Sequence, residues 1–387
     1  MIGRITILGA SAMGSALCTP MVQAGWEVRL WGTQFDDGLI DLYMRGEPHP
    51  MTSVAVSREV KLYRSAQLKE AMRGADVAVI SVASGGVPAI TELVLPYMSK
   101  LDSLWLTAKG FWETPEGHVE LLPETMRRIA AKARVTMPPI VSVGGPVIAK
   151  ECARGKPTAT VFGCHDLDIA NKYARTASTE AYRIEVTSDE IGLDIYSALK
   201  NAYAIALGIA DGRGELTAFP EQNLRAAIFV QAIRELGRIG EALGAHPDSI
   251  YTLAGIGDLE VTGTSGRNKF YGMRIGRGED PERALEQMQG LGQTVEGVRA
   301  TELGVRLLKQ RVPDLLEQLP LLRAINKTLF EGGRDAYGDI VKASLPTLPH
   351  GPAPRTEATS SSSRAEAGRS GLLKRIVSKL FGGGHSA

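Results

Sequence analysis

The chain is 387 residues long, which is too long for a single domain with one hydrophobic core. We therefore expect two domains that each bury a sizeable apolar interior. Lys and Arg total 44 against 43 Asp and Glu, and a formal charge of +1 gives no global field for binding nucleic acid. The cysteines, Cys18, Cys152 and Cys164, form no CxxC pair, so we expect neither a disulfide framework nor a metal site. No leader-like segment precedes the strand-like run at Ile5 and no stretch of about 18 apolar residues occurs, which favours a cytoplasmic protein.

Short β-branched runs alternate with helical segments through the first half of the chain. In order, the runs are RITILG, WEVRLW, ADVAVISV, SLWLTAKG, PPIVSVGG and TATVFG. This alternation is typical of a mostly parallel sheet covered on both faces, so the sequence predicts an α/β fold. We assign residues 1–187 to a dinucleotide-binding, Rossmann-like domain.

The first run leads into ITILGASAMGSALC, which nearly matches the glycine fingerprint of a dinucleotide-binding turn. Gly9 supplies the tight turn and Gly14 the close packing of helix on strand, while Ser11 stands where the second glycine is expected. Its hydroxyl can crowd a phosphate or donate a hydrogen bond to it. The alternative is a plain strand-to-helix turn in an unrelated α/β domain.

The second run ends in RLWGTQ, where a carboxylate would bind the ribose hydroxyls and select NAD. Thr33 is neutral, and no arginine stands nearby to bind a 2′-phosphate. We therefore expect either NAD or NADP as the cofactor, and the missing carboxylate slightly favours acceptance of NADP.

From about Ser188 to near Gly333, apolar residues recur at the spacing of long helices and no strand-like runs occur. The clearest helical segments are LDIYSALKNAYAIALGIADG, NLRAAIFVQAIRELGRIGEALG and TELGVRLLKQ. We assign residues 188–342 to an all-helical substrate and catalytic domain. Residues 343–387 are rich in Pro, Ser and Ala, which predicts a disordered tail.

Lys200 is the one charged residue in an otherwise apolar helical stretch, IYSALKNAYAIALGIA. Burial would lower the pKa of its ammonium toward values useful for proton transfer to a developing alkoxide. Equally open are a lysine that snorkels from a helix edge and a structural ion pair with Asp258 or Glu296.

The segment GIGDLEVTGTSGRNKFYG combines small residues, hydroxyls and a guanidinium before a helix that we expect to begin near Arg267. Backbone amides at such a point hold phosphate. Asp258, in the same turn-rich segment, can bind a substrate hydroxyl or orient Lys200. The alternative is that the glycines and threonines only separate helices and Arg267 is solvated.

Two further pieces follow strands, where ligands of parallel sheets collect. Lys109 follows a strand in LWLTAKGF, and Gly144, Gly145 and Pro146 lead from a strand into a helix. Taken alone, each of these two segments reads as an ordinary loop. Because both follow strands at the same edge of the sheet as Gly9, a functional role for them is favoured.

Together the glycine turn, TAKGF, GGPVIAKE, ALKNAYAIALGIADG, GIGDLEVTGTSGRN and TVEG occur in the order seen in glycerol-3-phosphate dehydrogenases that use NAD or NADP. This resemblance, from about residue 3 to 335, implies hydride transfer between NAD(P)H and dihydroxyacetone phosphate, forming sn-glycerol 3-phosphate for glycerophospholipid synthesis. By the same resemblance, Lys200 is the catalytic proton donor and acceptor. The implied substrate-binding residues are Lys109, Gly145, Asp258, Arg267 and Asn268. The implied cofactor-binding residues are Gly9, Ser11, Ala12, Met13, Gly14, Thr33, Lys109, Ala149, Arg267 and Glu296.

The chain departs from the family pattern at several positions. Val147 follows GGP where Ser or Thr is usual, Gly266 replaces the serine before Arg267, and Gln231 falls where an arginine is usual. Val147 and Gly266 each lack a hydroxyl that the family residue has, so fewer hydrogen-bonding groups are expected around the substrate. Two alternative functions therefore stay open: a superfamily reductase for another small phosphorylated or hydroxy-acid substrate, and a non-catalytic NAD(P)-binding protein.

The tail ends in GLLKRIVSKLFG, where apolar residues recur at helical spacing beside Lys374, Arg375 and Lys379. A short basic amphipathic helix of this kind can lie weakly on an anionic bilayer. It can equally fray or dock onto a partner subunit. A homodimer is expected by analogy with related helical domains.

Overall fold

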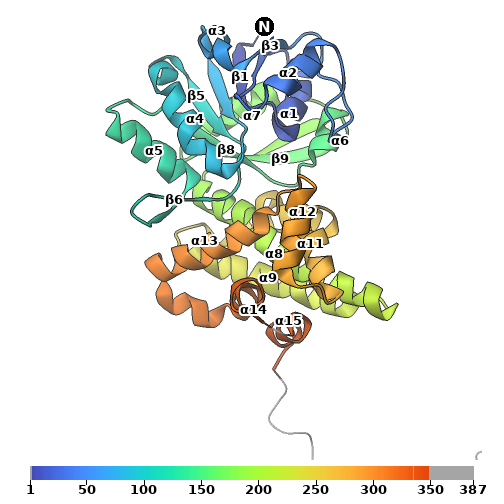
Figure 1. Cartoon of the computed structure of the whole chain (residues 1–387). Helices are drawn as coiled ribbons and strands as arrows, with labels where there is room; N and C mark the ends of the chain where they lie inside the picture. Colours follow the sequence, from blue (N-terminus) through green and yellow to red (C-terminus); the bar gives the residue numbers. More distant parts are fainter. Residues whose placement is uncertain (1, 334, 348–387) are drawn as a thin grey trace, which may run out of the picture. The chain divides into compact units, whose positions relative to one another are not determined.

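The structure, a computed structural model, describes residues 2–333 and 335–347 (Figure 1). Met1–Leu345 forms one compact unit. The predicted amphipathic segment and nearly all of the predicted tail lie outside the described residues. None of the described helices is both long and apolar enough to cross a bilayer.

An eight-stranded sheet forms the centre of the N-terminal half, in the order β10-β9-β8-β5-β4-β1-β2-β3. Its neighbouring strands are parallel, except that β8 and β9 are antiparallel. The strands are β1 (Arg4–Leu8), β2 (Glu27–Trp31), β3 (Lys61–Tyr63), β4 (Val77–Ile80), β5 (Ser103–Leu106), β8 (Ile140–Gly144), β9 (Thr158–Gly163) and β10 (Tyr182–Thr187). A separate antiparallel hairpin pairs β6 (Phe111–Glu113) with β7 (Val119–Leu121).

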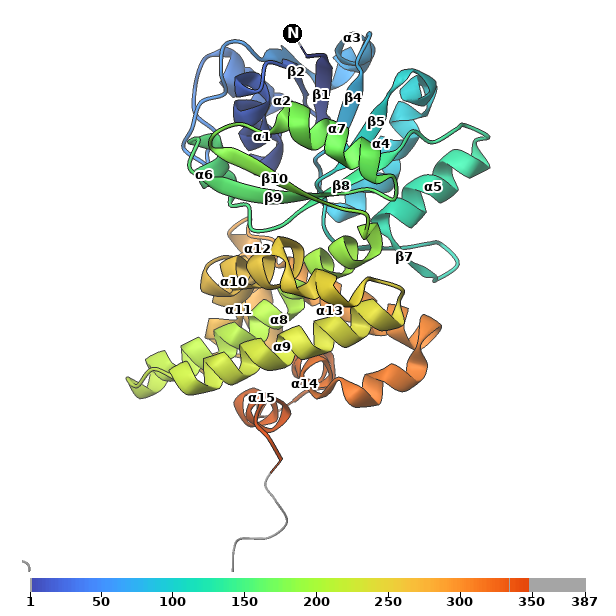
Figure 2. The ribbon, with the colours of Figure 1, turned by 180° about the vertical axis from the view of Figure 1, so that it is seen from behind.

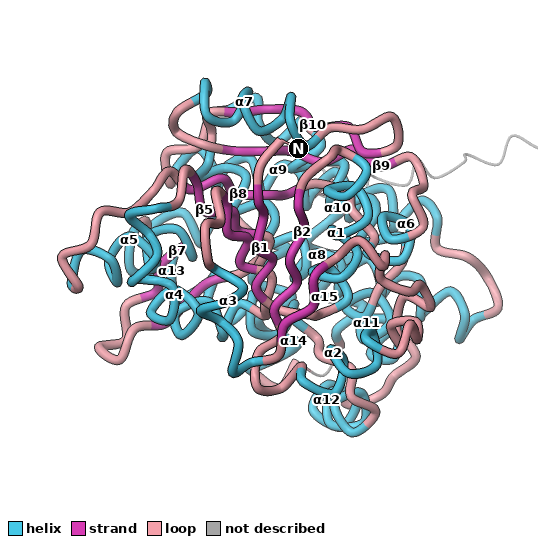
Figure 3. Tube along the Cα trace, turned by 90° about the horizontal axis from the view of Figure 1, so that it is seen from above, coloured by secondary structure: helices cyan, strands magenta, loops and turns pink. Residues whose placement is uncertain are grey.

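Helices cover both faces of the sheet (Figures 2 and 3). One apolar core lies under α1 (Ala12–Gln23), α2 (Asp37–Met44), α6 (Ala149–Ala153) and α7 (Leu167–Ala177). The other lies under α3 (Leu68–Met72), α4 (Val87–Val94) and α5 (Leu122–Lys132). The central strand β4 is wholly apolar, and β1 is buried from Ile5 to Leu8, because both faces of these strands are covered.

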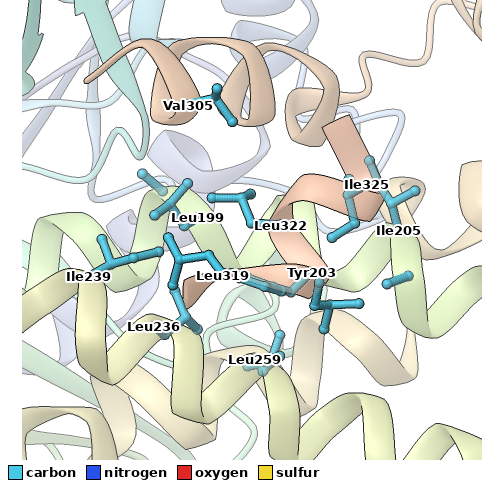
Figure 4. Close-up of a cluster of buried hydrophobic side chains, with 14 of the residues drawn as sticks. Leu199, Tyr203, Ile205, Leu236, Ile239, Leu259, Val305, Leu319, Leu322 and Ile325 are labelled. Atoms are coloured by element: carbon cyan, nitrogen blue, oxygen red, sulfur yellow. The ribbon is translucent and has the colours of Figure 1, made fainter. Parts of the chain in front are cut away.

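The C-terminal half is helical and is built around α8 (Glu190–Thr217). The other helices are α9 (Gln222–Ala242), α10 (Asp258–Thr264), α11 (Arg267–Gly276), α12 (Pro281–Gly290), α13 (Glu296–Arg311), α14 (Pro320–Phe330) and α15 (Ala336–Ser344). A π-helical turn, Leu253–Gly257, leads into α10. The 3₁₀ turns of the described chain are Ser65–Gln67, Ser84–Gly86, Leu95–Lys100, Pro247–Tyr251 and Pro313–Gln318. Figure 4 shows side chains of α8, α9, α13 and α14 meeting in one core.

Glycines let α8 and α11 touch backbone to backbone. A Cβ added to Gly272 would lie 2.1 Å from the Ile205 carbonyl oxygen, and one on Gly212 would lie 2.0 Å from that of Met273. Gly208 and Gly276 are equally tight, so no larger residue fits this contact without displacing main chain. The contact fixes where the first residues of α11 lie along α8.

A buried carboxylate orients α14. Glu235 of α9 is fully buried and accepts hydrogen bonds from the backbone N–H groups of Leu321 (2.7 Å) and Leu322 (2.8 Å) at the start of α14. The Tyr203 hydroxyl and the Gln231 amide also donate hydrogen bonds to the Glu235 carboxylate. Gln231, one of the departures from the family pattern, therefore supports a helix junction.

The predicted fold class is confirmed, and the six predicted strand runs are strands. The strands β3 and β10 and the β6–β7 hairpin were not predicted from the sequence. The helical periodicity was expected to end near Gly333, whereas α15 follows at Ala336–Ser344. The expectation that Asp258 lies in a turn-rich segment was wrong, because Asp258 is the first residue of α10.

Candidate active site

A cleft of about 520 Å³ lies at the carboxyl ends of β1, β4, β5 and β8 and reaches the first residue of α11. Ligands of parallel sheets bind at this edge. The sequence-predicted residues that line it are Ser11, Ala12, Met13, Lys109, Gly145, Ala149, Arg267 and Glu296, and the family departures Val147 and Gly266 line it as well. The structure thus brings together segments spread over almost 300 positions of the sequence.

The glycine turn has the backbone geometry that the sequence predicted. Gly9 has φ of +114°, and a Cβ added there would lie 2.5 Å from the Ser81 carbonyl oxygen. A Cβ on Gly14 would lie 2.1 Å from the Gly9 carbonyl oxygen. Both positions therefore require glycine, for turn conformation and for close packing.

Ser11 is the N-cap of α1. Its hydroxyl accepts from the Gly14 N–H at 3.4 Å and donates to the Ser81 carbonyl at 3.1 Å. The hydroxyl proton is therefore used within the protein. Ser11 replaces the middle glycine as a helix cap, which explains how the turn keeps its shape without that glycine.

Thr33 does not line the cleft. Its hydroxyl and N–H both donate to Asp36 Oδ2, at 2.9 and 3.0 Å, and the Ala10 N–H of the glycine turn is 3.3 Å from the same oxygen. Asp36, which the sequence analysis did not name, thus ties the end of β2 to the glycine turn. Its place 22 residues after Gly14 was the available signal.

Lys200, Asp258 and Lys109 form one ionic cluster. The Lys200 ammonium is hydrogen-bonded to Asp258 Oδ1, and Lys109 Nζ lies 2.8 Å from Asp258 Oδ2 and 3.3 Å from the Gly145 carbonyl oxygen. The side chains of Lys200 and Asp258 are 8 % and 1 % exposed, against 22 % for Lys109. Lys109 therefore faces the cleft, and Lys200 lies behind it.

The burial of Lys200 has an electrostatic consequence. Desolvation lowers the pKa of its ammonium to about 7, while the neighbouring Asp258 carboxylate acts in the opposite direction and Lys109 adds to the lowering. The snorkelling alternative is excluded by this burial, and Lys200 pairs with Asp258 rather than Glu296. The ion pair and a proton-transfer role are compatible, because a pKa of this size allows either charge state near neutrality.

The first residues of α11 close the other side of the cleft. Gly266, with φ of +120°, precedes the helix, and the Arg267 guanidinium contacts the Thr294 hydroxyl at 2.6 Å and Glu296 at 3.5 Å. As predicted, the helix begins at Arg267. Its unpaired first-turn N–H groups make this end suited to an anion.

Asn268 is almost fully buried and holds neighbouring elements. Its amide nitrogen donates to Asn201 Oδ1, and its oxygen accepts from the Gly297 N–H, both at 2.8 Å. Asn201 of α8 and Lys109 line a small cavity of about 80 Å³ that shares Ser84, Lys109 and Glu296 with the cleft. Asn201 was missed by the sequence analysis, although it directly follows Lys200.

Two other large cavities contain none of the predicted site residues: one of about 490 Å³ among α13, α14 and α15, and one of about 500 Å³ beside β6. We take the cleft at the sheet edge as the candidate active site because it is the one of these three that contains Lys109 of the Lys200 cluster. Within residues 2–333 and 335–347, no group of three or more His, Cys, Asp or Glu side chains could hold a metal ion.

Two family models match the chain: the N-terminus of NAD-dependent glycerol-3-phosphate dehydrogenase over residues 4–170 and its C-terminus over residues 189–336. An NADP(+)-dependent glycerol-3-phosphate dehydrogenase from Archaeoglobus fulgidus is 34% identical over 85% of this chain and 95% of its own length. A glycerol-3-phosphate dehydrogenase [NAD(P)+] from Symbiobacterium thermophilum is 33% identical over 85% of this chain and 90% of its own.

Among solved structures, glycerol-3-phosphate dehydrogenase from Coxiella burnetii matches with a TM-score of 0.74 at 26% identity, over 88% of this chain and 98% of that one. These matches favour the predicted dehydrogenase over the two alternative functions, and they confirm the predicted resemblance. The chain belongs to the NAD-dependent glycerol-3-phosphate dehydrogenase family.

Proposed function

We propose that this chain interconverts dihydroxyacetone phosphate and sn-glycerol 3-phosphate with NADH or NADPH, and that Lys200 transfers the proton. The observation that carries the proposal is the buried Lys200–Asp258–Lys109 cluster beside a cleft whose two walls are suited to two different phosphates. One wall is the glycine turn before α1, and the other is the start of α11.

The sheet side of the cleft fits a dinucleotide. Its volume of about 520 Å³ lies within the usual size of cofactor sites, and the first residues of α1, a helix N-terminus suited to binding phosphate, lie along it. Ala12, Met13 and Ala149 line this side. The nicotinamide supplies the hydride when it is bound.

The helical side fits the substrate phosphate. The start of α11 offers backbone N–H groups, and Arg267 adds a guanidinium whose present partners, Thr294 and Glu296, are exchangeable surface contacts. Lys109 faces the cleft between this end and the sheet. Asn268 supports the site from behind through Asn201 and Gly297.

Lys200 then handles the proton at the reacting oxygen. In the direction of reduction the charged Lys200 Nζ gives a proton to the carbonyl oxygen as it becomes an alkoxide, and in oxidation the neutral amine takes the proton back. Asp258 holds the Nζ in place, and its pairing with Lys109 keeps a second cation near the developing negative charge.

We further propose a cytoplasmic homodimer that serves glycerophospholipid synthesis, does not bind nucleic acid, and touches membranes weakly through residues 372–381. The buried free cysteines support the compartment, the charge of +1 argues against nucleic-acid binding, and the basic amphipathic pattern of the tail supports the membrane contact. The homodimer rests on analogy with related helical domains. Equal co-sedimentation of the full chain and of a chain ending at Lys342 with anionic liposomes would refute the membrane contact.

The testing experiment is the initial rate of NADH or NADPH oxidation with dihydroxyacetone phosphate, measured separately for each nucleotide. Oxidation that yields sn-glycerol 3-phosphate with either nucleotide is the expected result, and the ratio of the two rates gives the cofactor preference. If neither NADH nor NADPH is oxidised, at concentrations where calorimetry shows that the nucleotide binds, the proposed reaction is refuted.

A further inference from the structure

The junction between α10 and α11 controls two parts of the candidate site at once. α10 begins with Asp258, which holds Lys200 and Lys109, and α11 begins with Arg267 at the proposed phosphate site. Only Ser265 and Gly266 separate the two helices. Whatever fixes this junction therefore fixes the spacing between the proton-transfer group and the phosphate site.

Two cations hold the junction by its carbonyl oxygens. Arg225 Nη2 of α9 donates to the Gly263 carbonyl at 3.0 Å, and Lys269 Nζ of α11 donates to the Thr264 carbonyl at 3.1 Å. Both carbonyls belong to the last turn of α10, which has no intrahelical donors left for them. Basic side chains thus cap the end of this helix.

A single carboxylate from α8 binds both cations. Asp211 Oδ2 lies 2.9 Å from Lys269 Nζ, and Asp211 Oδ1 lies 3.6 Å from Arg225 Nε. Each of the three side chains is only about a fifth exposed. At this burial an uncompensated pair of cations repels strongly, so the anion is needed to keep both donors on their carbonyls.

Asp211 also lies next to the tightest backbone contact of the two helices. Its neighbour Gly212 packs on the Met273 carbonyl, and Lys200 lies on the same helix 11 residues earlier, about three turns away. The carboxylate therefore extends from the rigid helix that carries Lys200 to the segment that presents Arg267.

We propose that Asp211 is a positioning residue for substrate phosphate binding, acting through Arg225 and Lys269 on the α10–α11 junction. The inference rests on the proposed function. Asp211 does not line the cleft, and it acts by holding the start of α11 at a fixed distance from Lys200.

The test compares steady-state constants of the full-length wild type with those of Asp211→Asn and Asp211→Glu. The Asn variant keeps the side-chain shape and removes the charge, so we expect the KM for dihydroxyacetone phosphate to rise about tenfold or more. The kcat at saturation and the KM for the nucleotide should stay within about twofold. Asp211→Glu restores the anion and should recover most of the lost substrate affinity.

Glu27→Gln is the matched control. Glu27 also bridges cations, Arg29 at 2.7 Å, Lys61 at 3.0 Å and Arg4 at 3.5 Å, and is 13 % exposed, but it lies at the start of β2, at the amino ends of the strands and away from the cleft at their carboxyl ends. This variant should keep the wild-type KM for dihydroxyacetone phosphate.

The outcomes separate the two proposals. An active wild type with an unchanged substrate KM in Asp211→Asn overturns the positioning role and leaves the proposed reaction intact. A loss confined to kcat or to the fraction of folded protein, without a change in KM, also overturns it, because a merely structural role predicts that result. A wild type that does not turn over dihydroxyacetone phosphate refutes the proposed function and this inference with it.

Discussion

Replacing Lys200 by Met removes the ammonium and keeps an unbranched side chain of similar length. Because Asp258 retains Lys109 at 2.8 Å, the buried carboxylate is not left without a counter-ion, so we expect the variant to fold. The glycine turn and α1 are untouched, and nucleotide affinity should stay within about twofold of the wild type.

The expected loss of activity follows from two independent estimates. A general acid contributes roughly 10²–10⁴ to a rate. A unit charge about 4 Å from a developing alkoxide contributes about 4 kcal/mol at an effective dielectric constant of about 20, and this value corresponds to a factor of about 10³. We therefore expect kcat for reduction of dihydroxyacetone phosphate to fall about a thousandfold.

Initial rates of NADH oxidation at saturating substrate measure this change, and calorimetric titration of the nucleotide checks the binding. Lys327→Met serves as the control, because Lys327 also pairs with a carboxylate, Asp339 at 2.8 Å, in the helical part and away from the cleft. A fall in kcat of less than tenfold, with nucleotide binding intact, would show that Lys200 is not the proton donor.

Three further outcomes follow from the structure. Since burial lowers the pKa of Lys200 to about 7 in the ligand-free chain and reduction needs its charged form, kcat/KM for reduction should fall as pH rises through that value, while kcat/KM for oxidation should rise. Parallel pH profiles in both directions would contradict this. Gly272→Ala forces a Cβ to within 2.1 Å of the Ile205 carbonyl oxygen and should lower the free energy of unfolding by about 1–3 kcal/mol. Gly290 lies in open space at a helix end, so Gly290→Ala should leave the free energy of unfolding unchanged. Thermal unfolding of both variants tests this. Glu235→Gln places an amide donor against a backbone N–H at the start of α14 and should cost about 1–3 kcal/mol, and an unchanged midpoint in urea would disprove that account.

Much of the sheet could be predicted because its central strands are buried on both faces and are therefore rich in β-branched and other apolar residues. β10 carried a usable signal, since YRIEVT alternates strictly, and the analysis overlooked it. β3 is a three-residue strand with no buried residue, so no hydrophobic pattern marks it. The antiparallel pairing of β8 with β9 depends on how the chain returns to the sheet, which local sequence does not encode.

The individual parts of the site could be predicted from chemistry, but their pairings could not. The lone charge in an apolar helix marked Lys200, while its choice of Asp258 over Glu296 depends on the packing of α10 against α8. Ser11 was expected to meet a phosphate, and the structure uses its hydroxyl as a helix cap. Asn201 was missed because a neutral amide beside the more conspicuous Lys200 gives no separate signal until Asn268 is seen to bind it.

The glycine contact of α8 with α11 has a consequence for substrate choice. Main chain rather than side chain separates the helix that carries Lys200 from the helix that begins at Arg267, so no rotamer change can widen the gap. Under the proposed function, one helix handles the reacting oxygen and the other holds the phosphate. We therefore expect the chain to favour a three-carbon phosphate over longer or shorter ones, because main chain sets the distance between the two helices.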